Sequence, residues 1–415
     1  MLRDRDIVCI ANTPWEGDYQ KSTVLLLSRL AEHNRVLYVA YARTVKDLLQ
    51  CWKNKNYAAV KQMLGFSPRL QPVAVRGDYT VHVLTLPPVW PYAVAKSCWP
   101  LFKLILFINA RLVRGTIKKA VQSLAMREVI SITAFNPFYG LFLRGYLKEA
   151  ANLYYCYDGI QGQRYGQAAV RIEKEFIKKI DGVIVTNTAL AGEKSAWNRN
   201  CHVVKNGVDY PLFAAVAEAG PKPVHQRKVV GYIGSIDQRF DIEVVCWCIA
   251  QLPECDFVLV GRVVNEAAAA RLRAFPNVSM KPPVAPDQVP AIMYASDVGI
   301  IPYTRTALNR NVYPLKINEY LAVGTPVVMT DFADLDEFQG VAVTAHSKEE
   351  FLQALRDTLA GDTAPKQKQR MLVASHNSWD RRAEEFAYAI EKTILHKQMV
   401  NHHESTTRPG LAAAN

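Results

Sequence analysis

The feature that most limits what this chain can fold into is a repeated alternation of short apolar runs with amphipathic helical stretches. In the first half, Asp6–Ala11 has the composition of a buried strand and Gln20–Glu32 has the periodicity of a helix. The second half repeats the scheme with Val229–Ile233 and Ile242–Leu252. Strands that alternate with helices form parallel sheets covered by helices on both faces. The sequence therefore predicts an α/β fold built from doubly wound sheets.

The length and one Gly- and Pro-rich segment indicate two domains. A chain of 415 residues is long enough for about two or three domains, and residues 206–227 separate the two series of strands and helices. We therefore predict an N-terminal domain over residues 1–205, completed by a last helix over residues 378–397. The C-terminal domain is predicted over residues 206–377. Residues 398–415 are polar and without apolar periodicity, and we expect them to be a disordered tail.

The excess of positive charge is confined to the first half of the chain. Residues 1–181 contain 26 Lys and Arg against 13 Asp and Glu, whereas residues 182–415 contain 24 against 25. An excess of this size in one region favours contact with an anionic partner. Nucleic acid and the surface of an anionic membrane are the two candidates.

One segment of the basic half has the composition of a helix that lies in a lipid interface. Residues 89–113 are rich in Trp and bulky aliphatic residues, and Arg114, Lys118 and Lys119 follow them. Such a flanked apolar segment is typical of interfacial helices, although a helix buried between domains is the alternative. The N-terminus does not read as a signal peptide. We therefore expect a cytoplasmic protein, peripheral on the inner face of the cell membrane.

Several common kinds of site are missing from the sequence. It has no GxxxxGK[ST] phosphate loop and no GxGxxG motif after a predicted strand. None of the eight cysteines forms a CxxC pair, and the histidines are scattered. We therefore expect no metal site and no cofactor.

A glycine-containing turn after the strand predicted at residues 229–233 is a candidate phosphate site. Gly234 would let a diphosphate approach backbone N–H groups, and Arg239 would offset its charge. Similar turns between strands and helices are common for packing reasons alone. This turn therefore needs a second feature before it indicates a ligand.

That second feature is a region that runs from Tyr303 through Asn311 to a helix predicted over residues 314–323. Lys316 and Glu319 lie three residues apart near the start of this helix, so their side chains share one face. A lysine near a helix N-terminus adds to the positive potential there and suits a phosphate. The glutamate is then placed to accept hydrogen bonds from sugar hydroxyls, although a surface ion pair is the simpler interpretation.

The run Pro-Leu-Lys-x-x-Glu-Tyr-Leu-Ala-x-Gly-Thr-Pro-Val-Val closely resembles the donor-nucleotide motif of GT-B glycosyltransferases. Further segments fit the family in the same order, so the resemblance covers most of the chain; they are residues 205–209, 258–261, 276–278, 294–303 and 378–379. It implies two Rossmann-like domains that face each other across a cleft, with a UDP- or GDP-sugar bound by the C-terminal domain. The donor-binding residues would be Gly234, Arg239, Tyr303, Asn311, Lys316 and Glu319.

The stereochemistry of transfer depends on two carboxylates. Retaining members of family 4 carry a Glu, seven residues and a second Glu; here the second is Glu319, but position 311 is Asn. The strand that ends in Asp158-Gly159 resembles a segment of the xanthan-pathway glucuronosyltransferase, in which the Asp is the base of an inverting reaction, and it is similar to teichuronic-acid type transferases. We therefore expect inversion, with Asp158 taking the proton of the acceptor hydroxyl. A helix N-cap is the alternative role.

These features together predict a transferase that moves a sugar from a nucleotide-sugar to a lipid-linked saccharide in bacterial surface-polysaccharide synthesis, such as that of exopolysaccharide. Trp15 and Asn136 would line the acceptor side. A retaining family-4-like transferase and a nucleotide-sugar 2-epimerase are the alternatives. A non-catalytic nucleic-acid binder leaves the Lys316 and Glu319 pattern unexplained, so we expect no nucleic-acid partner.

Overall fold

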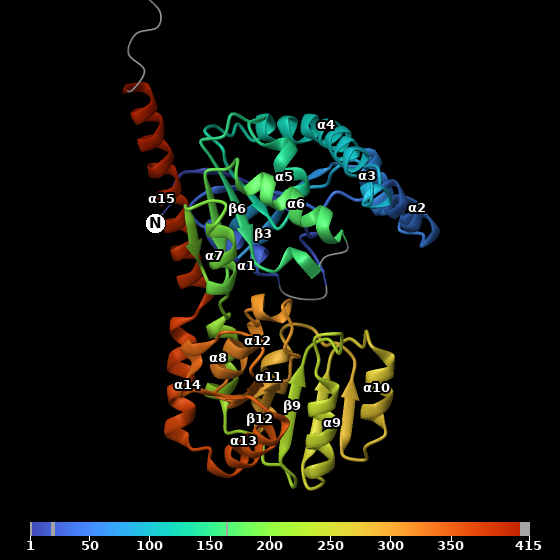
Figure 1. Ribbon diagram of the computed structural model, residues 1–415, viewed down its shortest axis with the longest axis vertical. Helices are drawn as coiled ribbons and strands as arrows, with labels where there is room; N and C mark the ends of the chain where they lie inside the picture. The colour runs from blue at the N-terminus through green and yellow to red at the C-terminus, as the bar shows by residue number, and fades with distance from the viewer. Residues whose placement is uncertain (1, 18–20, 163–164, 407–415) are drawn as a thin grey trace, which may run out of the picture. The chain divides into compact units, whose positions relative to one another are not determined.

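The computed structural model describes residues 2–17, 21–162 and 165–406. These residues form two compact units (Figure 1). Unit 1 holds the described residues up to Val204 together with those from Ala383 onward, and unit 2 holds Lys205–Arg382. The chain therefore returns to unit 1 after it has completed unit 2.

Unit 1 is built on an eight-stranded sheet in the order β3-β4-β2-β1-β5-β6-β7-β8. Neighbouring strands are parallel except for β3 and β4, which form an antiparallel hairpin at one edge. The strands are β1 Asp6–Ala11, β2 Arg35–Val39, β3 Leu70–Val75, β4 Tyr79–Leu84, β5 Ile130–Ala134, β6 Ala151–Cys156, β7 Gly182–Val185 and β8 Cys201–Val203.

The helices of unit 1 follow from caps and apolar faces that the sequence supplies. Thr44 and Asp47 form a reciprocal capping box at the start of α2, and the Asn187 side chain caps α7. The helices and short 3-10 segments are α1 Ser22–Leu30, α2 Val45–Lys53, α3 Tyr57–Leu64, η1 Tyr92–Ala95, α4 Trp99–Ser123, α5 Pro137–Leu143, η2 Ile160–Gly162, α6 Gly166–Ile177 and α7 Thr188–Ser195.

Unit 2 is built on a six-stranded parallel sheet in the order β11-β10-β9-β12-β13-β14. Its strands are β9 Val229–Ile233, β10 Asp256–Val260, β11 Val278–Lys281, β12 Val298–Ile301, β13 Val327–Thr330 and β14 Ala342–Ala345. Its helices and 3-10 segments are α8 Tyr210–Ala219, α9 Ile242–Gln251, α10 Glu266–Arg273, α11 Val289–Ala295, η3 Asn309–Asn311, α12 Leu315–Ala322, η4 Asp336–Phe338, α13 Lys348–Gly361 and α14 Ala364–His376.

The central strands are buried along their whole length. Every residue of β1, β5 and β6 in unit 1 is buried, and so is every residue of β12 and β13 in unit 2. Each sheet has its own hydrophobic core. A parallel strand between two layers of helices needs apolar side chains on both faces, which explains the continuous apolar runs in the sequence. The predicted α/β class with two doubly wound sheets is confirmed.

Residues 206–227, which separate the two series of strands and helices in the sequence, include a helix in the structure. Residues 210–219 form helix α8 within unit 2, and its first turn contains Pro211. Proline fits the first turn of a helix, where its missing N–H leaves no hydrogen bond unmade. The Gly and Pro residues of this segment therefore flank or begin a helix.

The last helix, α15, is longer than its apolar pattern suggested. It runs from Trp379 to Thr406, so residues 398–406, which we expected to be disordered, are helical. Neither Gly nor Pro occurs between Trp379 and Pro409. A helix that has formed can therefore propagate through these polar residues. The remainder of the predicted tail, residues 407–415, lies outside the described residues. In unit 1, Lys397 of this helix forms an ion pair with Asp181 at 2.9 Å.

The apolar segment at residues 89–113 contributes most of α4. Pro100 lies in the first turn of this helix, where proline is tolerated, so the helix continues without a break to Ser123. No helix among the described residues is both long and apolar enough to cross a membrane.

Candidate functional site

Two glycines shape the loop that follows β9 in unit 2. Gly234 has a φ of +156°, and a Cβ at this position would lie 2.2 Å from Lys316 Nζ. Gly261, which follows β10, has a φ of +148°, and a Cβ there would lie 2.1 Å from the carbonyl oxygen of Gly234. The Gly234 N–H donates to the carbonyl of Val260 at 2.9 Å. The loop therefore packs directly against a lysine side chain, and only glycine fits its conformation and its space.

Lys316, in the first turn of α12, is held by aromatic rings. Its Nζ lies 4.5 Å from the ring centroid of Tyr232 and 5.2 Å from that of Tyr303. Across the described ranges, no Asp or Glu forms an ion pair with this ammonium group. Because ring faces attract a cation without neutralising its charge, Lys316 keeps its full charge for an anion. Tyr232 gave no signal in the sequence, since a tyrosine in a buried strand has the pattern of a core residue.

Arg239, which was expected to offset the charge of a diphosphate, pairs with a carboxylate of its own loop. Its guanidinium forms an ion pair with Asp237, in which Nη2 lies 2.7 Å from Oδ2. Burial alone would raise the pKa of the Asp237 carboxyl, but hydrogen bonds from Arg239 outweigh this effect and lower it. The Arg239 charge is therefore balanced within the loop, so Lys316 is the main source of positive potential beside Gly234.

Glu319 lies one turn along α12 from Lys316. Burial raises the pKa of its carboxyl to about 7, and the Lys316 charge opposes that rise. Asn311 is buried in η3, where its backbone N–H donates to the carbonyl of Leu308. Unit 2 thus brings Gly234, Arg239, Tyr303 and Lys316 together near the carboxyl ends of β9 and β12, with Glu319 one turn further along α12. This arrangement suits a phosphate on Lys316 and a hydroxyl on Glu319.

In unit 1, the loops that follow β1 and β5 are tied to each other. The Asn12 N–H donates to the Ala134 carbonyl at 3.1 Å, and Asn136 Nδ2 donates to the Ala11 carbonyl at 3.0 Å. Asn136 Oδ1 also accepts the N–H of Tyr139, which caps α5. Both ends of the Asn136 amide therefore have structural partners. The ring of Trp15 packs edge to face on Tyr38, with centroids 5.0 Å apart.

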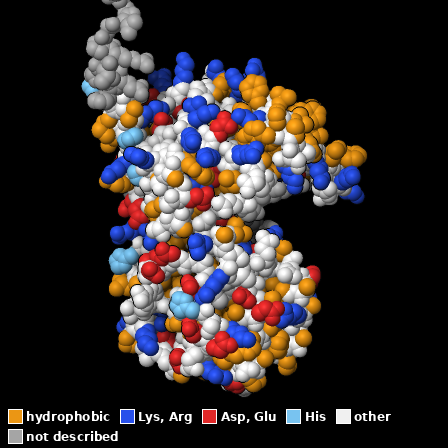
Figure 2. Space-filling model, in the orientation of Figure 1, with side chains coloured by type: hydrophobic (Ala, Val, Ile, Leu, Met, Phe, Trp, Pro, Cys, Tyr) orange, Lys and Arg blue, Asp and Glu red, His pale blue; other side chains and the backbone are white. Residues whose placement is uncertain are grey.

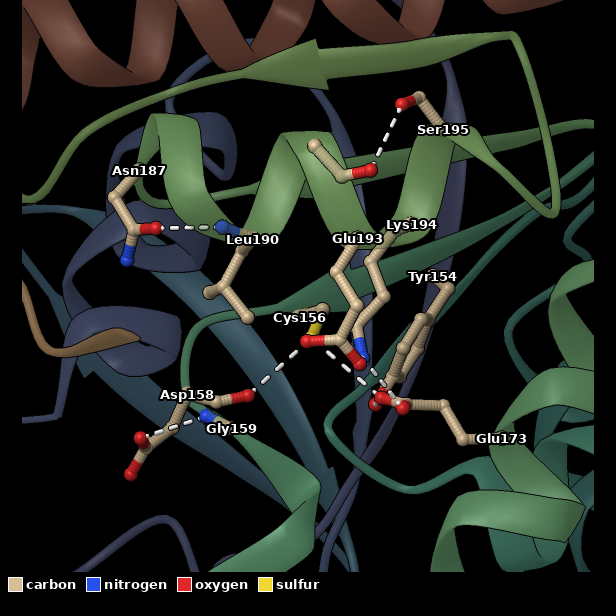
Figure 3. A network of polar contacts seen from close by, with 11 residues as sticks. Tyr154, Cys156, Asp158, Gly159, Glu173, Asn187, Leu190, Glu193, Lys194 and Ser195 are labelled. Carbon is tan, nitrogen blue, oxygen red and sulfur yellow. Dashed lines mark hydrogen bonds and ion pairs between the residues drawn. The ribbon is translucent and has the colours of Figure 1, made fainter. Parts of the chain in front are cut away.

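Asp158 lies two residues beyond β6, which ends at Cys156, slightly before the strand end expected from the sequence (Figure 3). Its Oδ1 accepts the N–H of Gly159 at 2.7 Å, and its side chain is partly exposed. It does not cap α6, because that helix begins at Gly166 after an N-cap at Tyr165. The expected alternative role as the N-cap of the following α-helix is therefore wrong.

A buried polar network lies next to Asp158 and was not anticipated from the sequence (Figure 3). Lys194 Nζ lies 2.7 Å from Glu173 Oε2, and both side chains are fully buried. Tyr154 OH donates to Glu173 Oε1 at 2.8 Å. The Cys156 thiol lies 3.6 Å from the same oxygen and 3.4 Å from the backbone carbonyl of Asp158. The network therefore links a buried ion pair to the backbone of the candidate base.

The charges of this network depend on one another. Burial raises the pKa of Glu173, and the Lys194 ammonium opposes that effect. Burial lowers the pKa of Lys194, but the Glu173 carboxylate, which pairs with the ammonium group, outweighs this effect and raises the pKa. Burial also raises the pKa of the Cys156 thiol well above its usual range, so this cysteine remains a thiol at neutral pH.

Comparison with known families identifies the domain that carries Lys316. Residues 227–361 match the family model described as Glycosyl transferases group 1. The chain is also 32% identical over 176 residues to a Bacillus subtilis protein named as the teichuronic acid biosynthesis glycosyltransferase TuaH. That match covers 40% of this chain and 44% of the relative, so it spans less than half of either protein.

Solved structures share the fold over nearly the whole chain. The UDP-forming α,α-trehalose-phosphate synthase of Burkholderia xenovorans aligns with a TM-score of 0.65 and 12% identity, over 93% of this chain and 100% of that one. The Anabaena protein HepE, solved with UDP and glucose, aligns with a TM-score of 0.63 and 14% identity, over 93% and 99%. The chain therefore carries a domain that matches the group 1 glycosyltransferases, and its two Rossmann-like sheets have the GT-B fold of these solved structures.

Proposed function

We propose that this protein transfers a sugar from a nucleotide-sugar to an acceptor hydroxyl, and that unit 2 binds the donor. One observation carries the proposal: the Lys316 ammonium lies against the Gly234 loop without a carboxylate ion-pair partner among the described residues. Both residues lie within the stretch that matches the group 1 family model. A diphosphate in this loop would receive backbone N–H groups and one full positive charge.

The other donor residues have supporting roles in this proposal. Glu319 accepts hydrogen bonds from the hydroxyls of the ribose or the donor sugar. Arg239, fixed by Asp237, and Tyr303, which lies under Lys316, keep the loop in its shape. Asn311 lies on the chain segment that leads into α12 and lines the donor side. The donor is a UDP- or GDP-sugar.

We propose that transfer occurs with retention of the anomeric configuration. The match of residues 227–361 to the group 1 family supports retention more strongly than the inversion expected from the sequence. In a retaining reaction, the acceptor oxygen forms its bond to the anomeric carbon on the face from which the phosphate leaves. The phosphate oxygen can then take the hydroxyl proton, so no protein carboxylate has to act as the base.

Inversion with Asp158 as the base is the second candidate. Two observations favour it: Asp158 lies at the carboxyl end of β6, and Asn stands at position 311 where retaining family-4 members carry a Glu. Nuclear magnetic resonance of the new glycosidic bond distinguishes the two candidates. The anomeric configuration of the donor should be kept in the product; an opposite configuration would establish inversion.

The acceptor is a saccharide of a bacterial surface polysaccharide, and we propose that a lipid carries it at the inner face of the cell membrane. The relative named for teichuronic acid biosynthesis supports the polysaccharide class. Lipid linkage rests on the apolar and basic composition of α4. A nucleotide-sugar 2-epimerase would need no acceptor, so release of nucleotide that depends on an added saccharide separates the two activities.

A thermal-shift screen with UDP-, GDP-, dTDP- and CMP-sugars tests the donor site directly. A ligand at 100 times its dissociation constant adds about 2.7 kcal/mol to the free energy of unfolding. We expect a UDP- or GDP-sugar to raise the melting temperature of the wild type and to lose most of this effect in Lys316→Ala. Lys348→Ala is the matched control, because Lys348 also lies over a ring, that of Trp247, at 5.2 Å. Equal shifts in all three proteins would refute the proposed site.

A further inference from the structure

Helix α4 has two apolar faces, and unit 1 covers only one of them. Its buried face includes Phe102, Leu106, Val113 and Ile117. A second stripe recurs at helical spacing and is exposed: Leu101 46%, Leu104 52%, Ile108 40% and Leu112 48%. A helix that is apolar on both sides is normally surrounded by protein or lies in lipid. The described residues therefore leave this stripe uncovered.

The helices α2 and α3 add large exposed side chains to the same region. Trp52 on α2 is 60% exposed, and Phe66, just after α3, is 80% exposed. Leu49, Tyr57 and Leu64 on these two helices are also exposed. Figure 2 shows hydrophobic side chains and Lys or Arg side chains gathered over the part of unit 1 where Figure 1 labels α2, α3 and α4.

Hydrogen bonds join these helices into one surface. The Val45 N–H at the start of α2 donates to the Val89 carbonyl at 2.9 Å, and Val89 N–H donates to the Arg43 carbonyl at 3.0 Å. The next residue, Trp90, is bound at both its N–H and its carbonyl by the buried Asn109 side chain of α4. We call the surface formed by residues 43–66 and the exposed side of residues 90–119 the apolar–basic surface.

The charge of this surface is almost entirely positive. Residues 90–119 contain no Asp or Glu, and the one acidic residue within 43–66, Asp47, forms the capping box of α2. The basic residues of the two segments are Arg43, Lys46, Lys53, Lys55, Lys61, Lys96, Lys103, Arg111, Arg114, Lys118 and Lys119. Among them, Lys103 forms an ion pair with Glu175 at 2.9 Å, so its charge is balanced. Of the four basic residues at the end of the exposed stripe, Arg111, Lys118 and Lys119 are exposed and Arg114 is partly buried.

We propose that the apolar–basic surface binds the surface of an anionic phospholipid membrane. The bulky apolar side chains would enter the boundary between headgroups and acyl chains, while Lys and Arg reach the lipid phosphates. Nucleic acid would use the basic residues but would leave the aliphatic stripe of α4 without a role. The inference deepens the proposed function, on which it rests, because it names the surface through which the enzyme meets a lipid-linked acceptor.

Sedimentation with vesicles tests this inference. The full-length protein should sediment with vesicles that contain phosphatidylglycerol and should remain in solution with pure phosphatidylcholine. Each basic residue near an anionic surface contributes about fivefold to partitioning, so Lys118→Glu/Lys119→Glu should lower binding by about 25-fold or more at low salt. Leu104→Ser/Ile108→Ser should lower binding at every salt concentration, because burial of apolar surface is not screened.

Two control variants in unit 2 match these changes in charge and in polarity. Lys366→Glu/Lys368→Glu changes the net charge equally, and Leu372→Ser replaces a leucine that is 59% exposed on α14. Both should bind vesicles like the wild type. Equal loss in test and control variants would refute the surface, as would wild-type protein that ignores phosphatidylglycerol or that binds both lipids equally. Displacement of the protein from vesicles by random RNA would reassign the surface to nucleic acid.

Nucleotide binding separates this inference from the proposed function. The two test variants of α4 should keep the thermal shift that the wild type shows with UDP or GDP, since none of their changed residues belongs to unit 2. Lost nucleotide binding in Lys316→Ala with unchanged vesicle binding would support both proposals independently. Vesicle binding without any nucleotide-dependent shift in the wild type would contradict the proposed function and leave the membrane surface standing.

Discussion

Lys316 in unit 2 and Lys194 in unit 1 show how the same side chain serves binding in one place and folding in another. Each ammonium lies over an aromatic ring, Tyr232 at 4.5 Å for Lys316 and Trp197 at 5.0 Å for Lys194. Lys194 is fully buried and forms ion pairs with Glu173 and Glu193, whereas Lys316 forms no ion pair with any described carboxylate. A cation whose charge is already balanced stabilises the fold, and one whose charge is not balanced can bind an anion.

The largest effect should come from breaking the buried pair in unit 1. Lys194→Met leaves the Glu173 carboxylate buried without its cation, which costs about 3–5 kcal/mol of stability. Denaturant unfolding followed by circular dichroism should show this loss for unit 1. Thermal shifts with UDP should remain, because Lys194 lies outside unit 2.

A double variant sharpens this prediction. Glu173→Leu/Lys194→Met removes both charges and should recover most of the lost stability, since an apolar pair needs no charge compensation. Glu173→Leu alone should be less harmful than Lys194→Met alone, because Glu193 still forms an ion pair with Lys194. If the double variant loses as much free energy of unfolding as the two single variants together, the two residues are not coupled.

The second largest effect should come from Lys316. Lys316→Ala removes a charge-assisted contact to phosphate, worth about 1.5–3 kcal/mol, so nucleotide affinity should fall about ten- to a hundredfold. Isothermal titration calorimetry with UDP and GDP measures this loss. The free energy of unfolding should change little, because the cation is partly exposed and has no ion pair to lose. A marked loss of stability without loss of affinity would reverse the roles assigned to the two lysines.

Glu319, the acidic neighbour of Lys316, provides a third and smaller test. Glu319, whose carboxyl has a pKa of about 7 against an ordinary 4.5, binds more protons when folded than when unfolded between these values. This residue therefore contributes stability at low pH that is lost as pH rises through 7. Nucleotide affinity should move in the opposite direction, because the ionised carboxyl is the better acceptor for sugar hydroxyls.

The change in affinity should be about tenfold between pH 6 and pH 8, which is the change in the ionised fraction of a group with this pKa. Glu319→Gln should remove the pH dependence and bind more weakly than the wild type at pH 8. Calorimetry with a UDP-sugar at several pH values measures both effects. An affinity that is constant across this range in the wild type would mean that Glu319 does not contact the donor.

These two lysines also mark how far the sequence could predict the molecule. Lys316 follows a Pro and precedes Glu319 and a Gly-Thr-Pro turn, so its local pattern was enough to select it. The central strands were also predictable from a local pattern, because both faces of each strand are covered and the strand is therefore a continuous apolar run. Lys194 lies in a polar stretch, and its partner Glu173 is 21 residues away, so only the packing of α6 against α7 brings the pair together.

The exposed stripe of α4 is likewise a feature that the sequence predicted only in part. The sequence identified an apolar and basic segment at residues 89–113, but it could not separate Phe102, which is buried, from Leu104, which is exposed. It also gave no reason to join α2 and α3 to this segment. That connection depends on backbone hydrogen bonds at Val89 and on the Asn109 side chain. Contacts between distant segments of this kind have no local signal.

The smallest effect should come from Asp158, which lies beside the buried network of Lys194. If transfer retains configuration, the phosphate takes the acceptor proton and Asp158→Asn should slow turnover by less than about tenfold, through acceptor positioning alone. An essential general base would instead contribute about 10²–10⁴ in rate. Asparagine keeps the Oδ1 atom that accepts the Gly159 N–H, so the loop after β6 should stay intact.

Three measurements on Asp158→Asn decide between the two mechanisms. Steady-state turnover gives the size of the loss, the free energy of unfolding shows whether the network with Cys156 and Glu173 is preserved, and the anomeric configuration of the product gives the stereochemistry. Near-normal turnover with a retained linkage supports the proposed mechanism. A loss of turnover above a hundredfold, with unchanged stability and an inverted linkage, would make Asp158 the catalytic base. Asp158 in unit 1 would then contribute more to the rate than Lys316 in unit 2 contributes to binding.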